Sequence, residues 1–340
     1  DVDLVNASGY KVGKNSSVQV NLTKTLSGKI YSDAFCTNEV TSITYAAYEE
    51  TKKVYYKDAV IESVDLTFVD NAAILTSDSA TVDFVSSLTW YDTDYGKRVP
   101  FTINNLDQAT THSSMPVLIK LNASVINYAD FESAGEDIRF TLNDHTTSLP
   151  YTVDTWNTSG DSFVWVEIPT ITASTQMTIY MYYNEPGGAA AEDPNNVWST
   201  YYGVWNMKKT GANYVDETAA GNNGVPAGTV TDVTGPIGNA TNYSAAASSS
   251  IDVGDDLSDV IGRTSTLSFW INTTQTGNNT NWQAPGITGI EEAGGGNDIF
   301  FGFIRGDGSI SVNAGNSGGA NSNFVVNDSS WRYVTISRVE

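Results

Sequence analysis

The clearest pattern of hydrophobic and polar positions lies between residues 137 and 186. Short runs of β-branched and aromatic residues are separated there by Gly, Pro, Asn, Asp and Ser, which predicts strands joined by turns. The runs at 163–168 and 177–183 are apolar at both odd and even positions, and side chains in a strand repeat every two residues. Both runs are therefore apolar on both faces. This is typical of a strand that is central in a sheet or lies inside a two-layer stack.

The N-terminal part of the chain shows a similar but shorter alternation. Apolar residues at alternate positions predict about six short strands, a density typical of a small sandwich of immunoglobulin-like size. The first fifteen residues are polar and predict an arm. This arm either adds a strand to a neighbouring copy or is a frayed terminus. The best strand candidates are 18–22, 43–45, 54–56, 64–68 and 82–84.

Further strands are predicted at 99–103 and 117–121, and the small residues at 187–191 predict a linker. The chain accordingly divides into three predicted domains. They are a small β-sandwich at residues 1–86, a second β-sandwich at 87–190 and a third β-domain at 191–340.

Composition agrees with an all-β chain. Of the 340 residues, 40% are hydrophobic and eight are Trp, which excludes a disordered protein. There are 29 Gly, Thr, Ser and Asn are abundant, and stretches with helical periodicity are few. We therefore predict an all-β fold of tandem β-sandwich domains.

Several separate motifs in the middle of the chain resemble one family, a prokaryotic extracellular β-domain of unknown function. In that family the domain typically lies directly before a laminin-G/concanavalin-A-like jelly roll. The resemblance implies architecture and location more than chemistry. Its motifs are Trp90-Tyr91, Tyr95-Gly96-Lys97-Arg98-Val99-Pro100, Asp137-Ile138-Arg139-Phe140, Pro150-Tyr151, Trp165 to Pro169, and Ile179 to Asn184.

Features beyond the linker resemble the jelly roll of such tandems. The resemblance implies a first strand at 197–207, a turn at 235–240, and strands at 267–271 and 331–338. It also implies further strands beyond the last residue, so we expect the jelly roll at 191–340 to be incomplete. Either the chain is a fragment of a longer protein, or another chain supplies the missing strands. Unpaired strand edges would otherwise favour aggregation.

Net charge and cysteine content limit the kinds of partner and of covalent link that the chain can have. The net charge of −22 repels phosphate backbones, so we expect no nucleic acid as a partner. The sequence shows no long apolar run, so we expect no direct membrane insertion. The abrupt start at Asp1, with no signal peptide, is typical of a processed mature terminus. The single cysteine, Cys36, excludes an intrachain disulfide. We predict an inert buried thiol there, with an intermolecular bridge as the alternative.

Residue types that carry catalysis are sparse. The two histidines, His112 and His145, lie in separate polar loops and are predicted to be exposed to solvent. This argues against a catalytic triad or a His-rich metal site. A jelly-roll glycosidase needs two carboxylates in one cleft. In such families these carboxylates occur on one strand in the pattern Glu-X-Asp-X-X-Glu, and the sequence lacks that pattern. We therefore expect that the protein is not an enzyme.

Calcium is the cofactor that the resemblance favours. Laminin-G-like domains often use the oxygens of loop Asp and Asn residues, and hard cations take oxygen ligands. No EF-hand pattern occurs, and solvated acidic loops are the alternative explanation. The candidate ligands are Asp252, Asp255, Asp256, Asp298 and Asp307.

Glycans are expected in two roles. Trp282 lies in a predicted loop and is the best candidate for stacking on a sugar ring. Most other Trp residues lie in strand patterns and are expected in the core. Ten Asn-X-Ser/Thr sequons are candidate glycosylation sites, although the motif also arises by chance in a chain of this composition. They are Asn6, Asn15, Asn21, Asn122, Asn157, Asn239, Asn242, Asn272, Asn278 and Asn327.

Together these features predict a secreted prokaryotic cell-surface protein with a structural or adhesive function. It would be a subunit of an extracellular filament or part of a larger adhesin that binds surface glycans, and self-association by strand addition is one route to assembly. Two alternatives stay open. One is the polysaccharide-targeting module of a carbohydrate-active enzyme. The other, implied by the resemblance, is the sensory ectodomain of an envelope protein.

Overall fold

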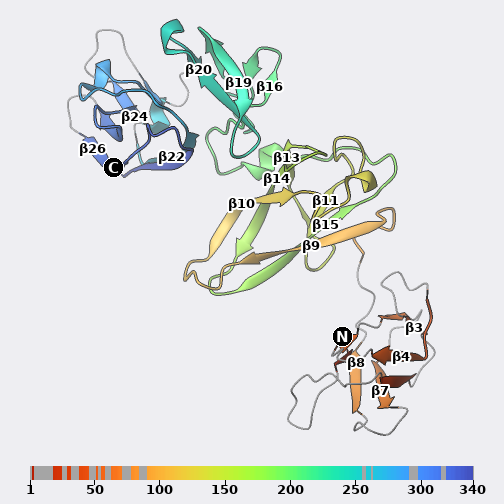
Figure 1. Ribbon diagram of the computed structural model, residues 1–340. Coiled ribbons are helices and arrows are strands. Elements are labelled where there is room, and N and C mark those ends of the chain that lie inside the picture. Colours follow the sequence, from red (N-terminus) through yellow and green to blue (C-terminus); the bar gives the residue numbers. More distant parts are fainter. Residues whose placement is uncertain are drawn as a thin grey trace. The chain divides into compact units, whose positions relative to one another are not determined.

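The computed structural model describes most of the chain after residue 89 (Figure 1). It divides into two compact units, Asp1–Trp90 and Tyr91–Glu340, and each is described by itself. Nearly all regular structure is β, which confirms the predicted fold class. The described residues are 2–3, 18–24, 29–31, 38–45, 51–52, 55–57, 63–70, 78–83, 90–254, 258–261, 263–290, 298–314 and 319–339.

The first unit contains short antiparallel strands at the places where the alternation predicts them. Four form a sheet in the order β4-β2-β7-β8, and β1 pairs with β5 and β3 with β6. Val2 and Asp3 of the predicted arm thus pair within their own chain. The rest of that arm and Cys36 lie outside the described residues. The strands are β1 (Val2–Asp3), β2 (Val18–Lys24), β3 (Lys29–Tyr31), β4 (Ser42–Tyr45), β5 (Thr51–Lys52), β6 (Tyr55–Lys57), β7 (Ser63–Asp70) and β8 (Asp78–Asp83).

The second unit begins with a β-sandwich of two antiparallel layers (Figure 1). One layer has the strand order β12-β11-β15-β9 and the other β10-β14-β13. A single 3-10 turn, η1, lies between β10 and β11. The elements are β9 (Lys97–Asn104), β10 (His112–Leu121), η1 (Tyr128–Asp130), β11 (Arg139–Leu142), β12 (Ser148–Leu149), β13 (Tyr151–Thr155), β14 (Ser162–Ile171) and β15 (Gln176–Tyr183).

The core of this sandwich follows the sequence pattern closely. In β14, Val164, Val166 and Ile168 are fully buried, and in β15 the same holds for Ile179 and Met181. Both strands are central in their sheets, as their two apolar faces predict. The outer strands β9 and β10 are long, and each contains a proline, Pro100 and Pro116 respectively. Proline is tolerated at sheet edges because no ladder hydrogen bond is needed there, and it discourages pairing with further strands.

The segment after the sandwich differs from the expectation. A first jelly-roll strand was expected at 197–207, and this is wrong: a short helix, α1 (Pro194–Val197), is followed by turns. The physical reason is local. Asp193 caps the helix by accepting the backbone N–H of Asn196, and Pro194 occupies its first turn. Small hairpins follow, and a tight turn closed by Gly235 N–H and Gly238 O lies where a turn was predicted. The elements are β16 (Lys209–Thr210), β17 (Asn213–Tyr214), β18 (Val225–Ala227), β19 (Val230–Thr234), β20 (Asn239–Tyr243), η2 (Ala245–Ala247) and β21 (Ser250–Asp252).

The last part of the chain has two layers of its own. A sheet with the order β23-β24-β25-β26 faces the β22–β27 ribbon, and both strands predicted for that ribbon are confirmed. Leu267 and Phe269 of β22 pack against a small core that contains Phe301, Ile310 and Val334. The elements are α2 (Ser258–Ile261), β22 (Ser265–Ile271), η4 (Asn281–Gln283), β23 (Gly289–Ile290), β24 (Ile299–Ile304), β25 (Ser309–Ala314), β26 (Gly319–Val325) and β27 (Arg332–Arg338). The described part of the chain contains no helix with the length and apolar character to span a membrane.

Candidate functional site

The outer face of the β12-β11-β15-β9 sheet carries an arginine between two tyrosines. Side chains alternate along β15, so Tyr180 and Tyr182 both point away from the core face of Ile179 and Met181. Arg98 of β9 pairs with Tyr182 across the sheet, and its Nη1 donates to the Tyr182 hydroxyl at 3.0 Å. The guanidinium carbon also lies 5.1 Å from the centre of the Tyr180 ring. This is a cation–π arrangement on the outside of the sandwich.

His145 joins this group from the turn between β11 and β12. Its ring is buried, which corrects the expectation of an exposed histidine. The Tyr182 hydroxyl accepts from Arg98 and forms a second hydrogen bond with Nδ1 of His145 at 2.8 Å. Burial, followed by the nearby Arg98 charge, lowers the pKa of His145. The site therefore favours a neutral imidazole. The preceding residue, Asp144, shapes the turn by accepting two backbone N–H groups.

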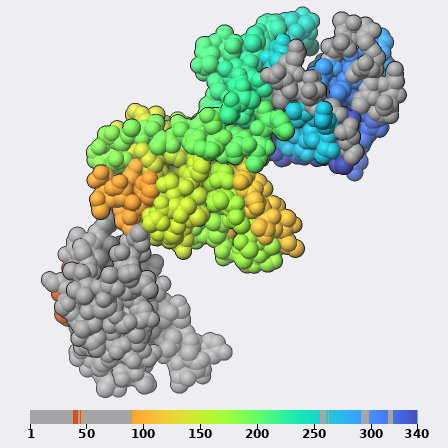
Figure 2. Space-filling model, turned by 180° about the vertical axis from the view of Figure 1, so that it is seen from behind, coloured from red at the N-terminus to blue at the C-terminus, as the bar shows by residue number. Residues whose placement is uncertain are grey.

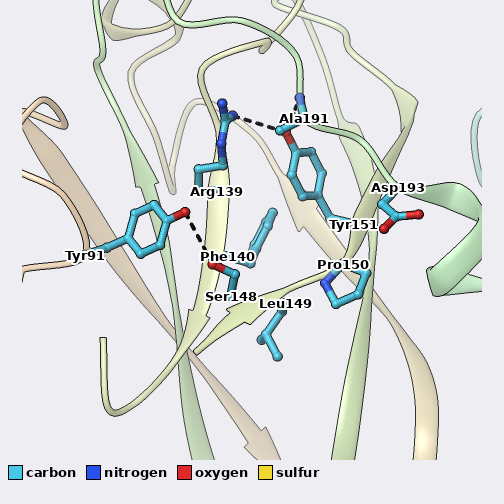
Figure 3. A pocket seen from close by; sticks show the side chains of 9 residues that line it. All are labelled: Tyr91, Arg139, Phe140, Ser148, Leu149, Pro150, Tyr151, Ala191 and Asp193. Carbon is cyan, nitrogen blue, oxygen red and sulfur yellow. Dashed lines mark hydrogen bonds between the residues drawn. The ribbon is translucent and has the colours of Figure 1, made fainter. Parts of the chain in front are cut away.

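A small pocket of about 250 Å³ is lined in part by Tyr91 (Figure 3), whose ring centre lies 5.7 Å from that of Tyr182. Within this lining the Ser148 hydroxyl donates to the Tyr91 hydroxyl at 3.3 Å. Arg139 faces the pocket but is already engaged, because it donates to Tyr151 Oη at 3.4 Å and to the carbonyls of Ile138 and Ala189. The lining residues are Tyr91, Arg139, Phe140, Ser148, Leu149, Pro150, Tyr151, Ala191 and Asp193.

The motif Asp137-Ile138-Arg139-Phe140 holds the fold together. Asp137 is buried, and its carboxylate accepts the backbone N–H groups of Glu132, Asn184 and Glu185 at 2.9–3.3 Å. Ile138 and Phe140 belong to the core. Arg139 fixes the segment that follows the sandwich through the Ala189 carbonyl. The motif therefore explains why the loops close around this sheet, and it supplies no reactive group.

The segment after the sandwich, from the predicted linker at 187–191 onward, lies against the sandwich, and Ala189 accepts from Arg139. In Figure 2 green atoms, the colour of residues near 200, lie against the yellow-green atoms of the sandwich. Trp198 is buried, and its ring centre lies 5.2 Å from that of Trp165 on the outer face of β14. Further along, Lys208 forms an ion pair of 2.6 Å with the buried Glu217 and donates to the Val153 carbonyl. These contacts make the segment after Pro186 part of the same compact body as the sandwich.

Asp154, at the end of β13, is a buried carboxyl within this contact region. It accepts the indole N–H of Trp165 at 3.3 Å and the hydroxyl of Thr155 at 3.0 Å. Burial raises the pKa of Asp154, and the Lys208 charge opposes that shift. Gly238 of the β19–β20 turn packs directly against Asp154 and Thr155.

The predicted calcium ligands are not brought together where the structure describes them. Asp252 is exposed and accepts the Gly254 N–H, while Asp307 accepts both N–H and O–H of Ser309 in the turn before β25. Those bonds lower the pKa of Asp307. Asp298 lies directly before β24, and Asp255 and Asp256 lie outside the described residues. Among the described residues no three His, Cys, Asp or Glu side chains form a metal-binding group. Calcium binding stays a prediction.

The glycosylation candidates differ in accessibility. Asn157, Asn239, Asn242 and Asn272 are exposed. A second group is half-buried with the side-chain amide engaged: Asn122 donates to Asp161, Asn278 to Gln283 and Asn327 to the Gln275 carbonyl. Asn6, Asn15 and the side chain of Asn21 lie outside what the structure describes.

Exposed aromatic side chains lie on the last part of the chain. Trp282, in η4, is 68% exposed, so its indole is available as predicted. The structure adds Trp270 and Tyr333, which are 41% and 58% exposed on β22 and β27. Strand Trp residues were expected in the core, and for Trp270 this is wrong. Its position has the same parity as Thr266 and Ser268, so it belongs to the polar face of the strand.

These observations define a β-sandwich domain with a docked C-terminal extension. Residues 134–212 match the model of a family described as a domain of unknown function (DUF2341). The chain therefore contains a DUF2341 domain, and this confirms the expected β-domain of unknown function. The match runs from just before β11, through α1, to just past β16, and so continues beyond Pro186 into the docked segment. Neither the curated proteins nor the solved structures yield a match to this chain.

Proposed function

We propose that this protein is a secreted prokaryotic cell-surface protein with a structural or adhesive function. It is a subunit of an extracellular filament or part of a larger adhesin, and its function is not catalytic. The observation that carries the proposal is the modular β architecture. The DUF2341-containing sandwich and the β22–β27 region have separate cores, drawn from 119–183 and 301–336. Strings of self-contained β-sandwiches are a common construction for cell-surface proteins.

The surface chemistry supports an extracellular setting. The net charge of −22 favours solubility and disfavours unspecific association with polyanions. Four of the sequons present exposed Asn side chains, so glycans can be attached without unfolding.

Strand addition is our proposal for assembly. Among the described residues, β22 and β27 each have one strand neighbour, namely the other. Their outer edges therefore offer unpaired N–H and C=O groups to a further strand. Neither strand contains proline, in contrast to β9 and β10. We propose that this region belongs to a jelly roll of the laminin-G/concanavalin-A type, and that strands from a neighbouring copy add to the edges of its two-stranded layer.

A second candidate function is favoured by the exposed aromatic side chains. Trp282, Trp270 and Tyr333 suit a polysaccharide-targeting module that delivers a carbohydrate-active enzyme to its substrate. That module would be dispersed and joined to a catalytic domain, whereas a filament subunit would be assembled.

The state of assembly tests the proposal. Material from the native source is examined by electron microscopy, and the denatured chain is weighed by mass spectrometry. Regular filaments, or a larger parent chain that carries further non-catalytic β-domains, support the proposal. A parent chain with a glycosidase domain would replace it with the targeting module.

A further inference from the structure

The outer face of the β22–β27 ribbon combines aromatic rings with hydroxyl groups. Leu267 and Phe269 point to the core, so the alternate residues of β22 point outward. The register places each outward residue opposite an outward residue of β27. The three cross-strand pairs are Thr266 with Ser337, Ser268 with Thr335, and Trp270 with Tyr333.

One end of this face is an aromatic pair. The ring centres of Trp270 and Tyr333 lie 5.2 Å apart at an interplanar angle of 49°. Both rings keep a large part of their surface in contact with water. Mutual contact fixes their orientation, so little side-chain entropy remains to be lost when a ligand stacks on them. A pyranose ring offers an apolar C–H face to such a pair and presents its hydroxyls at the rim.

The rest of the face carries paired hydroxyls. The oxygens of Thr266 and Ser337 lie 3.0 Å apart, and those of Ser268 and Thr335 also lie 3.0 Å apart. A hydroxyl has one proton and two lone pairs, so each pair uses one proton internally and leaves one O–H and further lone pairs for a ligand. At about 3.4 Å per strand residue the face is roughly 14 Å long. That length fits an oligosaccharide better than a single sugar.

The charges near this face favour neutral sugars over acidic ones. Both arginines of β27 are engaged: Arg332 forms an ion pair with Asp328, and Arg338 donates to the Ile261 carbonyl. The chain as a whole carries a net charge of −22. A polyanionic glycan would be repelled, and a neutral glycan would not.

We propose that the outer face of the β22–β27 ribbon is a binding site for neutral hexopyranose oligosaccharides. Trp270 and Tyr333 stack on the sugar, and the Ser and Thr hydroxyls form hydrogen bonds with its hydroxyl groups. The site deepens the adhesive role of the preceding section, and its biological meaning rests on that role. It differs from the site at Trp282, which lies in the 3-10 turn η4 and not on a strand.

The experiment titrates the full chain with cellohexaose, mannohexaose and chitohexaose, followed by calorimetry and tryptophan fluorescence. The test variants are Trp270→Ala and Tyr333→Ala, with Trp270→Phe to retain a ring. Phe324→Ala is the control, because it also removes an exposed aromatic ring, which is 42% exposed. Trp282→Ala tests the alternative loop site. Saturable binding of one hexaose is expected, weakened about tenfold or more by Trp270→Ala, as for loss of a central aromatic anchor. Phe324→Ala should leave the affinity within about twofold of the unaltered chain.

Circular dichroism and thermal unfolding of each variant establish that its fold is intact. Trp270→Phe is expected to retain most of the binding, which distinguishes lost stacking from lost structure. The proposal is overturned if no hexaose binds at millimolar concentration, or if Trp282→Ala and not Trp270→Ala removes binding. It is also overturned if polygalacturonate binds more tightly than the neutral sugars, or if Trp270→Ala only prevents self-association. Filaments without sugar binding would overturn this binding site and still support the proposed structural function.

Discussion

At the scale of single residues, Asp137 and His145 each hold a loop of the central sandwich in place. Asp137 accepts three backbone N–H groups, one from the loop before β11 and two from the residues directly after β15. His145 adopts a left-handed backbone conformation with φ of 59°, and its imidazole forms a hydrogen bond with the Tyr182 hydroxyl. Both side chains are buried, so loss of either leaves polar partners without water.

Replacement of Asp137 by Ala should lower the free energy of unfolding by about 2–4 kcal/mol, because buried N–H groups lose their acceptor. The control is Asp252→Ala, which removes an exposed carboxylate that accepts one N–H. Urea unfolding followed by tryptophan fluorescence measures both. Equal, small effects of the two substitutions would show that Asp137 does not tie the loops together.

His145 should make stability depend on pH. Its folded-state pKa is lowered from 6.5, so the fold favours the neutral ring. The unfolded chain then binds more protons below pH 6.5, and the stabilisation is present above that value and is lost as pH falls through it. Between about pH 7.5 and about pH 5.5 the melting temperature should fall more for the unaltered chain than for His145→Asn, because the variant has no titrating side chain at position 145. Parallel pH profiles for the two chains would contradict this account.

Neither role could be derived from the sequence. Asp137 is part of a motif, but its partners Asn184 and Glu185 are brought to it by the pairing of β11 with β15. His145 stands among polar neighbours, which predicts exposure. Its burial comes from Arg98, Tyr180 and Tyr182, which are distant in sequence.

At the scale of elements, the strands of the sandwich were predictable and the docked segment was not. The period-two alternation in β9, β14 and β15 identifies strands and faces, because those strands bury one or both faces. The stretch 197–207 is rich in aromatic residues, and this pattern predicts a strand. Its Trp198 is instead buried against Trp165 after the short helix α1. Local pattern shows that a segment is apolar, and tertiary contact decides its secondary structure.

The contact between the β19–β20 turn and the sandwich gives a sharp test at this scale. Gly238 has φ of 54°, and an added Cβ would collide with Asp154 and Thr155. Gly254 has φ of 82° and open space around it. Gly254→Ala should therefore show only the backbone cost, about 1 kcal/mol, whereas Gly238→Ala should cost more. Thermal unfolding and limited proteolysis of the hairpin measure the difference. Equal costs would mean that the turn does not press on β13.

At the scale of the whole molecule, the chain is a set of β-sandwich cores with a strongly negative surface. Cores of this size are stable through buried apolar area, and the excess of acidic groups opposes compaction by mutual repulsion. The same acidic surface disfavours polyanionic partners.

Salt should consequently stabilise the protein. Raising NaCl from about 0.01 M to about 0.3 M shortens the screening length and should raise the melting temperature.

Calcium chloride at equal ionic strength tests the predicted calcium site, since a specific ion adds its binding free energy to stability. A higher melting temperature in calcium than in NaCl supports that site. Identical curves would leave the acidic loops as solvated surface.

Location is the most direct test of the central claim, a structural or adhesive role at the cell surface. Antibodies against this chain are applied to intact, unpermeabilised cells of the source organism and located by immunogold electron microscopy, with a cytoplasmic protein as the control. The account predicts gold on the cell exterior, along filaments or in a surface layer. Label that appears only after permeabilisation, together with the control, would contradict it.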